Sequence, residues 1–285
     1  MGTMPCPVCN GQARTGHSVG EYTYYRCDCG LQFLPAGIDV SAVYGDDYFF
    51  GGGAGYPNYL QEGPLIKARG RHYAHIVAHH AAPRRLLDVG AAAGFILRGF
   101  QDCGWNGIGI EPNTTMAAYA RQISGVAVQV GTIEDFSAES QFDLVLMIQV
   151  LEHVRDLQQA TATAARITRS GGLWFLSTID GGSPLAKAMG GGWQGYAPPS
   201  VLRIFSRRAL DRLMGYLGFA RIAWGRPLIW ISGAHAKSIL AYRAGDGPVN
   251  STLAGLARVI PDRLALPYPG LDFSWSLYRK SVATS

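Results

Sequence analysis

Two acids and two glycines stand at the ends of two apolar runs in the first half of the chain. Asp88 and Gly90 end the run that begins at Leu86, and Gly94 follows Gly90 after three alanines. Glycine allows a tight turn and lets a ligand approach the backbone closely. Glu111 ends the next apolar run, where an acid can accept both ribose hydroxyls of a nucleoside. The pattern predicts a nucleoside-binding loop between a buried strand and a helix.

A dinucleotide fits this loop less well. A loop that binds a pyrophosphate carries Gly-x-Gly-x-x-Gly, whereas Ala92 stands two residues after Gly90 here. The carboxyl group of Asp88 ahead of the turn suits a ligand with an ammonium group, which it contacts directly or through water.

A second group of polar residues follows the apolar run that starts at Phe142, namely Gln149, Glu152 and His153. Ligands bind at the carboxyl ends of strands in open α/β sheets, so we expect these side chains to face the ligand. Histidine is the side chain best matched to proton transfer at neutral pH. His153 is therefore the candidate general base, and Glu152 would orient it or share the proton. The alternative is that His153 only contacts substrate or caps the next helix.

Four of the five cysteines form two pairs near the start of the chain, Cys6 with Cys9 and Cys27 with Cys29. Thiolates grouped two and two across a short hairpin predict a tetrahedral zinc site, and four cysteines leave no position for water. We therefore expect a structural zinc. Two disulfides are the alternative. The start of the chain shows no signal-peptide pattern, so we expect a cytoplasmic location, which disfavours disulfides.

The elements that must position these residues are strand-like runs separated by helical patterns. Five runs begin near Leu86, Gly107, Val126, Phe142 and Leu173, and two more are expected at Phe219–Gly225 and Ala236–Arg243. This alternation is typical of a three-layer α/β fold with a mostly parallel sheet. The chain has 285 residues, which suffices for one such domain and a small appendage. No apolar run reaches the ~20 residues that span a membrane, so no membrane contact is expected.

In this order and spacing, the motifs over roughly residues 65–243 resemble those of class I S-adenosylmethionine (SAM)-dependent methyltransferases. The resemblance implies a Rossmann-like seven-stranded sheet and SAM as the methyl donor. It places Asp88, Gly90, Ala91 and Gly94 at the methionine end of SAM and Glu111 with Pro112 at the ribose. It places Ile133 on the adenine, Thr132 or Glu134 at the adenine edge, and Gln149 near the sulfonium.

A ribbon, an aromatic segment and a helix ahead of the SAM loop resemble a bacterial subgroup of these enzymes. That subgroup includes zinc-containing deoxysugar C-methyltransferases and related secondary-metabolite enzymes, in which a Glu-His pair is implicated in substrate deprotonation. The segment with Tyr48 would cover the SAM site as a lid, or pack the ribbon on the core. The long Gly/Pro-rich loop after the fifth strand implies Trp193 and Tyr196 as acceptor-pocket residues, with ordinary packing as the alternative.

We expect four parts: a zinc ribbon in residues 1–40, a linker or lid in 41–64, the methyltransferase domain in 65–243 and a C-terminal extension in 244–285. The extension has a weak helical pattern at 248–259. It also has an alternating run at 273–278, interpreted as an edge strand or a homodimer contact. Residues 201–285 hold 12 basic and 4 acidic side chains. This excess favours an anionic or carrier-bound small-molecule acceptor, or it is simply a solvated basic surface.

Methyl transfer to an O, N or C atom of a small biosynthetic metabolite is the function that these patterns predict. One alternative is a SAM enzyme that acts on RNA or protein through the ribbon. The ribbon tyrosines have only Arg26 as a basic neighbour and no RNA-binding motif appears, so we expect no nucleic-acid partner. The other alternative is a non-catalytic partner subunit, which predicts a damaged SAM loop, whereas the loop residues here are intact.

Overall fold

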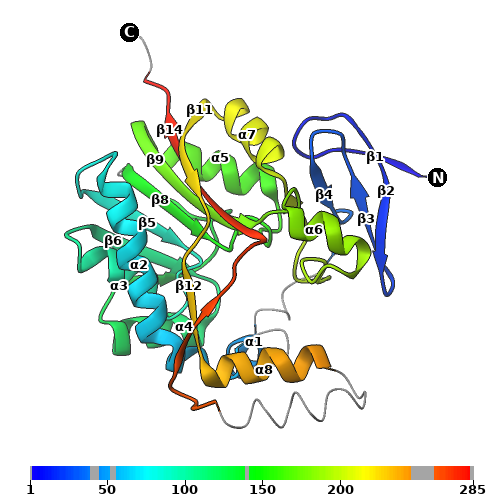
Figure 1. The fold of residues 1–285 in the computed structure, drawn as a ribbon. Coiled ribbons are helices and arrows are strands. Elements are labelled where there is room, and N and C mark those ends of the chain that lie inside the picture. Colours follow the sequence, from blue (N-terminus) through cyan, green and yellow to red (C-terminus); the bar gives the residue numbers. More distant parts are fainter. Residues whose placement is uncertain (1, 39–44, 52–55, 139–140, 245–259, 283–285) are drawn as a thin grey trace.

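The computed structural model describes residues 2–38, 45–51, 56–138, 141–244 and 260–282 (Figure 1). Its centre is a seven-stranded sheet in the order β11-β14-β9-β8-β5-β6-β7. The parallel strands are β5 (Arg85–Val89), β6 (Asn106–Glu111), β7 (Val128–Val130), β8 (Phe142–Ile148) and β9 (Thr168–Ile179). β14 (Phe273–Lys280) runs antiparallel to both of its neighbours, β9 and β11 (Phe219–Gly225). The carboxyl ends of the five parallel strands therefore meet at one edge.

Helices cover both faces of this sheet (Figure 1). On one face lie α2 (Gly63–Ala78), α3 (Phe95–Gln101) and α4 (Thr114–Tyr119), and on the other lie α5 (Leu157–Ile167) and α7 (Arg207–Tyr216). Successive strand residues point to opposite faces, so Leu86 and Leu144 join one core while Leu87 and Val145 join the other. The expected three-layer α/β fold is confirmed.

The seventh strand of the sheet is β14, and the prediction of a strand at Ala236–Arg243 is wrong. Those residues belong to helix α8 (Gly233–Ala244). A short apolar run does not by itself distinguish a helix from a strand. Because β14 lies between β9 and β11, the run at 273–278 is an inner strand and not an edge strand. The helical pattern at 248–259 lies outside the described residues.

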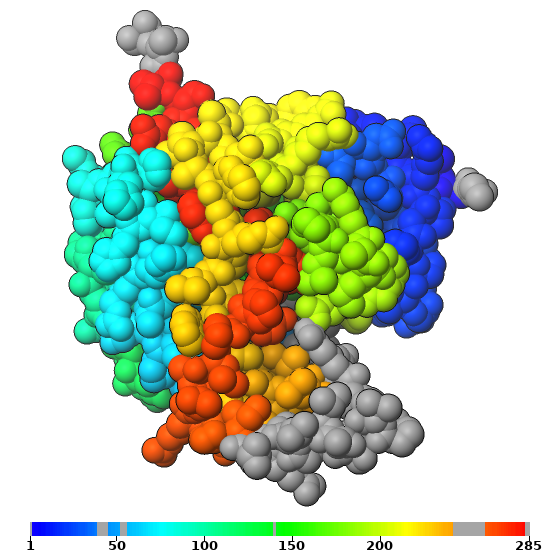
Figure 2. Space-filling model, in the orientation of Figure 1, coloured from blue at the N-terminus to red at the C-terminus, as the bar shows by residue number. Residues whose placement is uncertain are grey.

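The N-terminal ribbon is a second sheet, built from β1 (Thr3–Pro5), β2 (Gln12–Val19), β3 (Tyr22–Arg26) and β4 (Leu31–Phe33). Its fifth strand, β10 (Arg203–Phe205), comes from the segment between β9 and α7 and pairs antiparallel with β4. Figure 2 shows the ribbon in blue against the green and yellow segments that follow β9. The ribbon is thus joined to the larger sheet through β10.

The remaining elements are short and lie around the carboxyl edge of the large sheet or near the ribbon. They are α1 (Asp46–Phe50), η1 (Tyr59–Glu62), η2 (Ala120–Ser124), α6 (Pro184–Met189), η3 (Gly190–Gly192) and the pair β12 (Ile229–Ser232) and β13 (Ala265–Tyr268). The stretch after β9, expected as a loop, thus contains α6, which Ser183 caps and Pro184 begins. Among the described helices, none has both the length and the apolar character needed to cross a membrane.

Candidate active site

The loop between β5 and α3 has the backbone conformation that its glycines suggest. Gly90, Ala92 and Gly94 have φ angles of 68°, 46° and 75°, and Gly94 is the N-cap of α3. The amides of Gly90 and Ala91 donate to the carbonyl of Ile110 at 2.9 and 3.0 Å, which fastens the loop to the end of β6. A non-glycine residue in the left-handed region is costly and concentrates at functional sites, so Ala92 marks this loop as one.

Glu111 stands at the tip of β6, only 4% exposed. Its Oε2 atom accepts a hydrogen bond from the amide of Ala92 at 2.8 Å, and its Oε1 atom accepts one from the amide of Asn113 at 2.9 Å. Burial raises the pKa of Glu111, and the two amides oppose that effect. A carboxylate oxygen accepts more than one bond, so both oxygens keep the capacity to accept from a diol.

Asp88 lies behind the loop with a buried carboxyl group. Its Oδ2 atom has no hydrogen-bond partner among the described residues. Burial, and then the charge of Glu111, raise the pKa of Asp88 to about 8. A buried polar atom without a partner costs free energy, which a ligand group can recover. At pH 7 the Asp88 carboxyl of the free protein is thus mainly protonated, and a positively charged ligand group such as an ammonium would favour its ionised form.

Arg69 on α2 is a candidate site residue that the sequence reasoning missed. Burial lowers the pKa of its guanidinium, but the charges of Tyr73, Tyr56 and Tyr59 outweigh this and raise it overall. Arg69 takes part in none of the ion pairs of the described residues, and its Nε atom is buried without a partner. Tyr59 is near enough to Asp88 and Glu111 for both charges to contribute to its raised pKa. Tyr59 thus lies between the Arg69 guanidinium and the two acids, and the guanidinium keeps a donor for an anionic group. No local sequence pattern marks this arginine.

Gln149 follows β8 in a left-handed conformation, with φ of 57°. Its amide donates to the carbonyl of Ser177 on β9 at 2.8 Å, and its Nε2 atom lies 3.5 Å from the Ser177 hydroxyl oxygen. The same serine side chain hydrogen-bonds Tyr73 on α2. Ser177, a second residue that the sequence reasoning missed, therefore connects the tips of two strands with the helix that carries Arg69.

Glu152 lies at the exit of β8 and is 1% exposed. Its Oε1 atom accepts from the amide of Ile179 at 3.3 Å, while its Oε2 atom has no partner among the described residues. Burial raises the pKa of this carboxyl to about 7. Tyr48 approaches it from α1, since the charge of Glu152 contributes to the raised pKa of Tyr48 after burial and Tyr56. The carboxyl group is therefore poised to exchange a proton near neutral pH.

His153 is half-buried, and its Nδ1 atom lies 2.7 Å from the carbonyl oxygen of Ser200. A carbonyl oxygen only accepts, so we assign the proton to Nδ1 and the lone pair to Nε2. Burial lowers the pKa of His153 to about 4, against the opposing effect of the Ser200 carbonyl. The imidazole is therefore neutral at pH 7 and a weak base.

Helix α1 spans the space between the tips of β6 and β8. The carboxylate of Asp46 accepts from Asn113 and Thr115 at 3.2 Å each, and Tyr48 lies by Glu152. The ring of Phe49 packs edge-on against Tyr59, with centroids 5.4 Å apart. These contacts lie on the methyltransferase side, which favours the lid. Residues 41–44 and 52–55, also assigned to this segment, lie outside the described residues.

All three residues expected at the adenine have partners within the protein. Ile133 is 2% exposed and belongs to the core. The Oε1 atom of Glu134 accepts from the amides of Arg155 and Asp156 at 3.0 and 3.4 Å, so this carboxylate fixes the loop after β8. Thr132, two residues after β7, is half-buried, and its hydroxyl donates to Asp135 at 3.1 Å. All three residues stay predictions for the adenine site.

The expected pocket residues Trp193 and Tyr196 pack against protein instead of lining a cavity. Trp193 is 2% exposed, and its Nε1 atom donates to Asp272 at 2.9 Å. The hydroxyl of Tyr196 donates to Gln32 of the ribbon at 2.7 Å. The structure thus favours the packing alternative for both rings. Of the expected acceptor-pocket residues, Tyr48 lies near Glu152.

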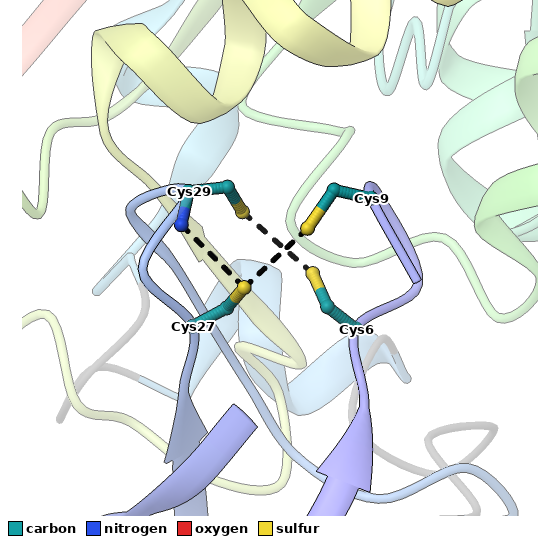
Figure 3. Close-up of side chains that lie close together, drawn as sticks. All are labelled: Cys6, Cys9, Cys27 and Cys29. Atoms are coloured by element: carbon teal, nitrogen blue, oxygen red, sulfur yellow. Dashed lines mark hydrogen bonds between the residues drawn. The ribbon is translucent and has the colours of Figure 1, made fainter. Parts of the chain in front are cut away.

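The four paired cysteines converge at the end of the ribbon, with their sulfur atoms pointing to a common centre (Figure 3). All four Sγ atoms lie within 4.8 Å of one another, with Cys6–Cys29 at 3.7 Å and Cys9–Cys27 at 3.5 Å. All are free thiols, so the disulfide alternative is wrong. A tetrahedron with Zn–S bonds of about 2.3 Å places sulfurs about 3.8 Å apart, which these distances match.

The strand order, the glycine loop and the acid at the tip of β6 define the fold of SAM-dependent methyltransferases. Comparison with known families agrees. The profile of the methyltransferase domain family matches residues 65–223, and the chain belongs to this family.

Individual relatives resemble the chain less closely. A ubiquinone biosynthesis O-methyltransferase from Rhodopseudomonas palustris is 32% identical over 101 residues, which cover 34% of this chain and only 40% of that protein. A 1,6-didemethyltoxoflavin N1-methyltransferase from Burkholderia thailandensis aligns over 94% of this chain and 100% of its own, with a TM-score of 0.53 and 15% identity. A SAM-dependent methyltransferase from Archaeoglobus fulgidus covers 85% of this chain and 100% of its own, with a TM-score of 0.53 and 16% identity. These structural likenesses show the fold alone.

Proposed function

We propose that this chain transfers the methyl group of SAM to an O, N or C atom of a small biosynthetic metabolite. The observation that carries the proposal is the position of Glu111. Amides of Ala92 and Asn113 hold its two carboxylate oxygens at the tip of β6, beside the buried carboxyl of Asp88. A ligand that fits this pair has a diol and a cationic group, and SAM has both.

Each residue that we propose to contact SAM has a distinct role. SAM, when bound, supplies a methyl group on a positively charged sulfur. Glu111 would accept the ribose hydroxyls, Asp88 would balance the ammonium and Arg69 would pair with the methionine carboxylate. The other residues proposed to line the cofactor are Gly90, Ala91 and Gly94 at the methionine end, Pro112 at the ribose, Thr132 at the adenine edge and Gln149 near the sulfonium.

Oxygen is the acceptor atom that the partial match to O-methyltransferases favours. A hydroxyl acceptor must lose a proton as it takes the methyl group. We assign this proton to the Oε2 atom of Glu152, which is unpartnered, and keep His153 as the neutral residue beside it. The geometry thus favours Glu152 over His153 as the base within the pair. The basic C-terminal third supports an anionic or carrier-bound acceptor.

We also propose that Cys6, Cys9, Cys27 and Cys29 hold a structural zinc ion. The sulfur distances support a tetrahedral site. Thiolates at all four corners exclude a catalytic water, so the ion would contribute to folding and not to chemistry.

Calorimetric titration with S-adenosylhomocysteine tests the proposed function. The variant Arg69→Met tests the assignment of Arg69 to the methionine carboxylate. The wild-type protein should bind one equivalent with micromolar or tighter affinity. Arg69→Met should weaken this about 10- to 100-fold, because a charged hydrogen-bonded pair contributes about 1.5–3 kcal/mol. Binding of 5′-methylthioadenosine, which lacks the amino-acid end, should be unchanged by Arg69→Met. Arg71→Met, two positions along the same helix, is the control. Equal losses for both ligands would contradict the carboxylate assignment, and no binding to folded wild-type protein would contradict the function.

The pH dependence of turnover distinguishes the two members of the catalytic pair. A base must be deprotonated to act, so kcat/KM should rise with pH through about 7 if Glu152 is the base, and through about 4 if His153 is. Glu152→Gln should lower kcat by about 100-fold or more, with a smaller loss for His153→Ala. A pH titration of the carboxyl carbon-13 resonances of labelled glutamate is an independent measurement. One resonance should titrate with a midpoint near 7 in the wild type and be absent in Glu152→Gln. A rise centred near 4 would return the role to His153.

A further inference from the structure

The segment 200–206 lies between the ribbon and the active site, and its first set of contacts faces the ribbon. The hydroxyl of Tyr24, a fully buried residue of β3, donates to the carbonyl of Val201 at 2.6 Å. The amide of Leu34 donates to the carbonyl of Leu202 at 2.9 Å. β10 then pairs with β4 from Arg203↔Phe33 to Phe205↔Leu31. The ribbon therefore fixes this segment along most of its length.

The second set of contacts faces the exit of β8. The amides of Leu202 and Arg203 donate to the backbone carbonyl of Glu152 at 2.9 and 3.1 Å. The carbonyl of Ser200 accepts from Nδ1 of His153 at 2.7 Å. The guanidinium of Arg203 donates to the carbonyl oxygens of the two residues after His153. Segment 200–206 thus bonds to both members of the catalytic pair and to the turn that follows them.

The cysteine cluster connects to the same segment. The amide of Cys27 donates to Leu31 at the start of β4, and the carbonyl of Gly30 accepts from the amide of Ser206 at 3.1 Å. Gly30 has φ of +94°, and a Cβ atom there would lie 2.1 Å from the hydroxyl oxygen of Ser206. The turn at residues 27–30, which contains Cys27 and Cys29, therefore touches the segment at Gly30 with no space for a side chain there. The shape of this turn depends on the positions of the two cysteines in the cluster.

From these two rows of contacts we infer that the ribbon is a positioning element of the active site, which acts through Tyr24 and β10 to hold Glu152 and His153 in place. The inference rests on the function proposed above. A shift of about 1 Å in a catalytic group is enough to lower a rate by about 100-fold, so a ribbon far from the methyl group affects the reaction through this chain of contacts. Tyr24 and Gly30 are positioning residues, since neither touches the proposed cofactor site.

The test compares two ribbon variants with matched controls in the same ribbon. Tyr24→Phe removes one hydroxyl and keeps the ring, and Gly30→Ala forces the knuckle away from Ser206. Tyr22→Phe, on the same strand, and Gly20→Ala, a left-handed glycine whose Cβ would meet nothing, are the controls. The readouts are amide hydrogen exchange in residues 149–156 and 86–94, and the affinity for S-adenosylhomocysteine. A sample stripped of metal by a chelator is measured alongside.

We expect exchange in residues 149–156 to rise at least about 10-fold in Tyr24→Phe, in Gly30→Ala and after metal removal. Exchange in 86–94 and the affinity for S-adenosylhomocysteine should stay within about twofold, and both controls should match wild type. With an acceptor, Tyr24→Phe should lower kcat about 10-fold and leave the KM for SAM unchanged. Unchanged exchange in 149–156 in Tyr24→Phe overturns the inference, even if Gly30→Ala fails to fold. If the wild type does not bind S-adenosylhomocysteine, the proposed function is wrong. The exchange result then decides by itself whether the ribbon holds residues 149–156 in place.

Discussion

Replacement of Glu111 by alanine is expected to lower the affinity for S-adenosylhomocysteine by a factor of about 100 or more while the protein stays folded. The variant loses two charge-assisted hydrogen bonds to the ribose, each with a contribution of about 1.5–3 kcal/mol. It also frees the amides of Ala92 and Asn113, so the glycine loop loses one of its bonds to β6 and keeps those of Gly90 and Ala91 to Ile110. Calorimetric titration measures the loss, and circular dichroism verifies the fold.

Glu111→Gln is the conservative partner of this experiment. Glutamine keeps the size of the side chain and one acceptor oxygen, so we expect an affinity between those of the alanine variant and the wild type. Glu21→Ala, at an exposed position in the ribbon, should bind as the wild type does. Micromolar binding by folded Glu111→Ala would remove the ribose assignment and, with it, the observation on which the proposed function rests.

Replacement of Cys9 by serine is expected to reduce bound zinc from one equivalent to well below one and to lower the Tm by about 10 °C. The binding energy of a structural zinc is folding energy, and a hydroxyl is a poor substitute for a thiolate ligand. A loss of roughly 3–5 kcal/mol corresponds to about 10 °C, at about 2–4 °C per kcal/mol for a domain of this size. Elemental analysis of reduced protein and thermal unfolding provide the two measurements.

Cys103→Ser is the matched control, because Cys103 lies outside the cluster and is half-buried at the end of α3. This variant should keep one zinc per chain and a Tm within about 2 °C of wild type. Freshly purified wild-type protein without metal, or equal zinc content in both variants, would contradict the zinc assignment.

The sequence was sufficient for those parts of the site that depend on local order. A strand, a glycine turn and a helix start follow one another directly around Gly90, and Glu111 ends the next strand, so adjacent segments predict their shared edge. Four cysteines in two pairs likewise predicted a cluster. Each of these features lies within short segments, and the residue types in those segments restrict their geometry.

What the sequence did not reveal depends on contacts between distant segments. Arg69 lies near Tyr56, Tyr59 and Tyr73, a grouping that forms only in the folded protein, and a single arginine on a helix carries no signature. The sequence predicts Trp193 as a pocket residue, but its indole donates a hydrogen bond to Asp272, which lies 79 positions away. The pairing of β10 with β4, and the location of β14 within the sheet, are likewise long-range choices that neither periodicity nor composition distinguishes.

The place of β14 also constrains the order of events during synthesis. β9 and β11 leave the ribosome before β14, yet they never touch in the finished sheet, because Tyr278 lies between Trp174 and Arg221. Until β14 arrives, the edges of β9 and β11 that face each other stay unpaired. A nascent chain is thus open to wrong edge pairing at this one gap, and a chaperone that covers strand edges would act there.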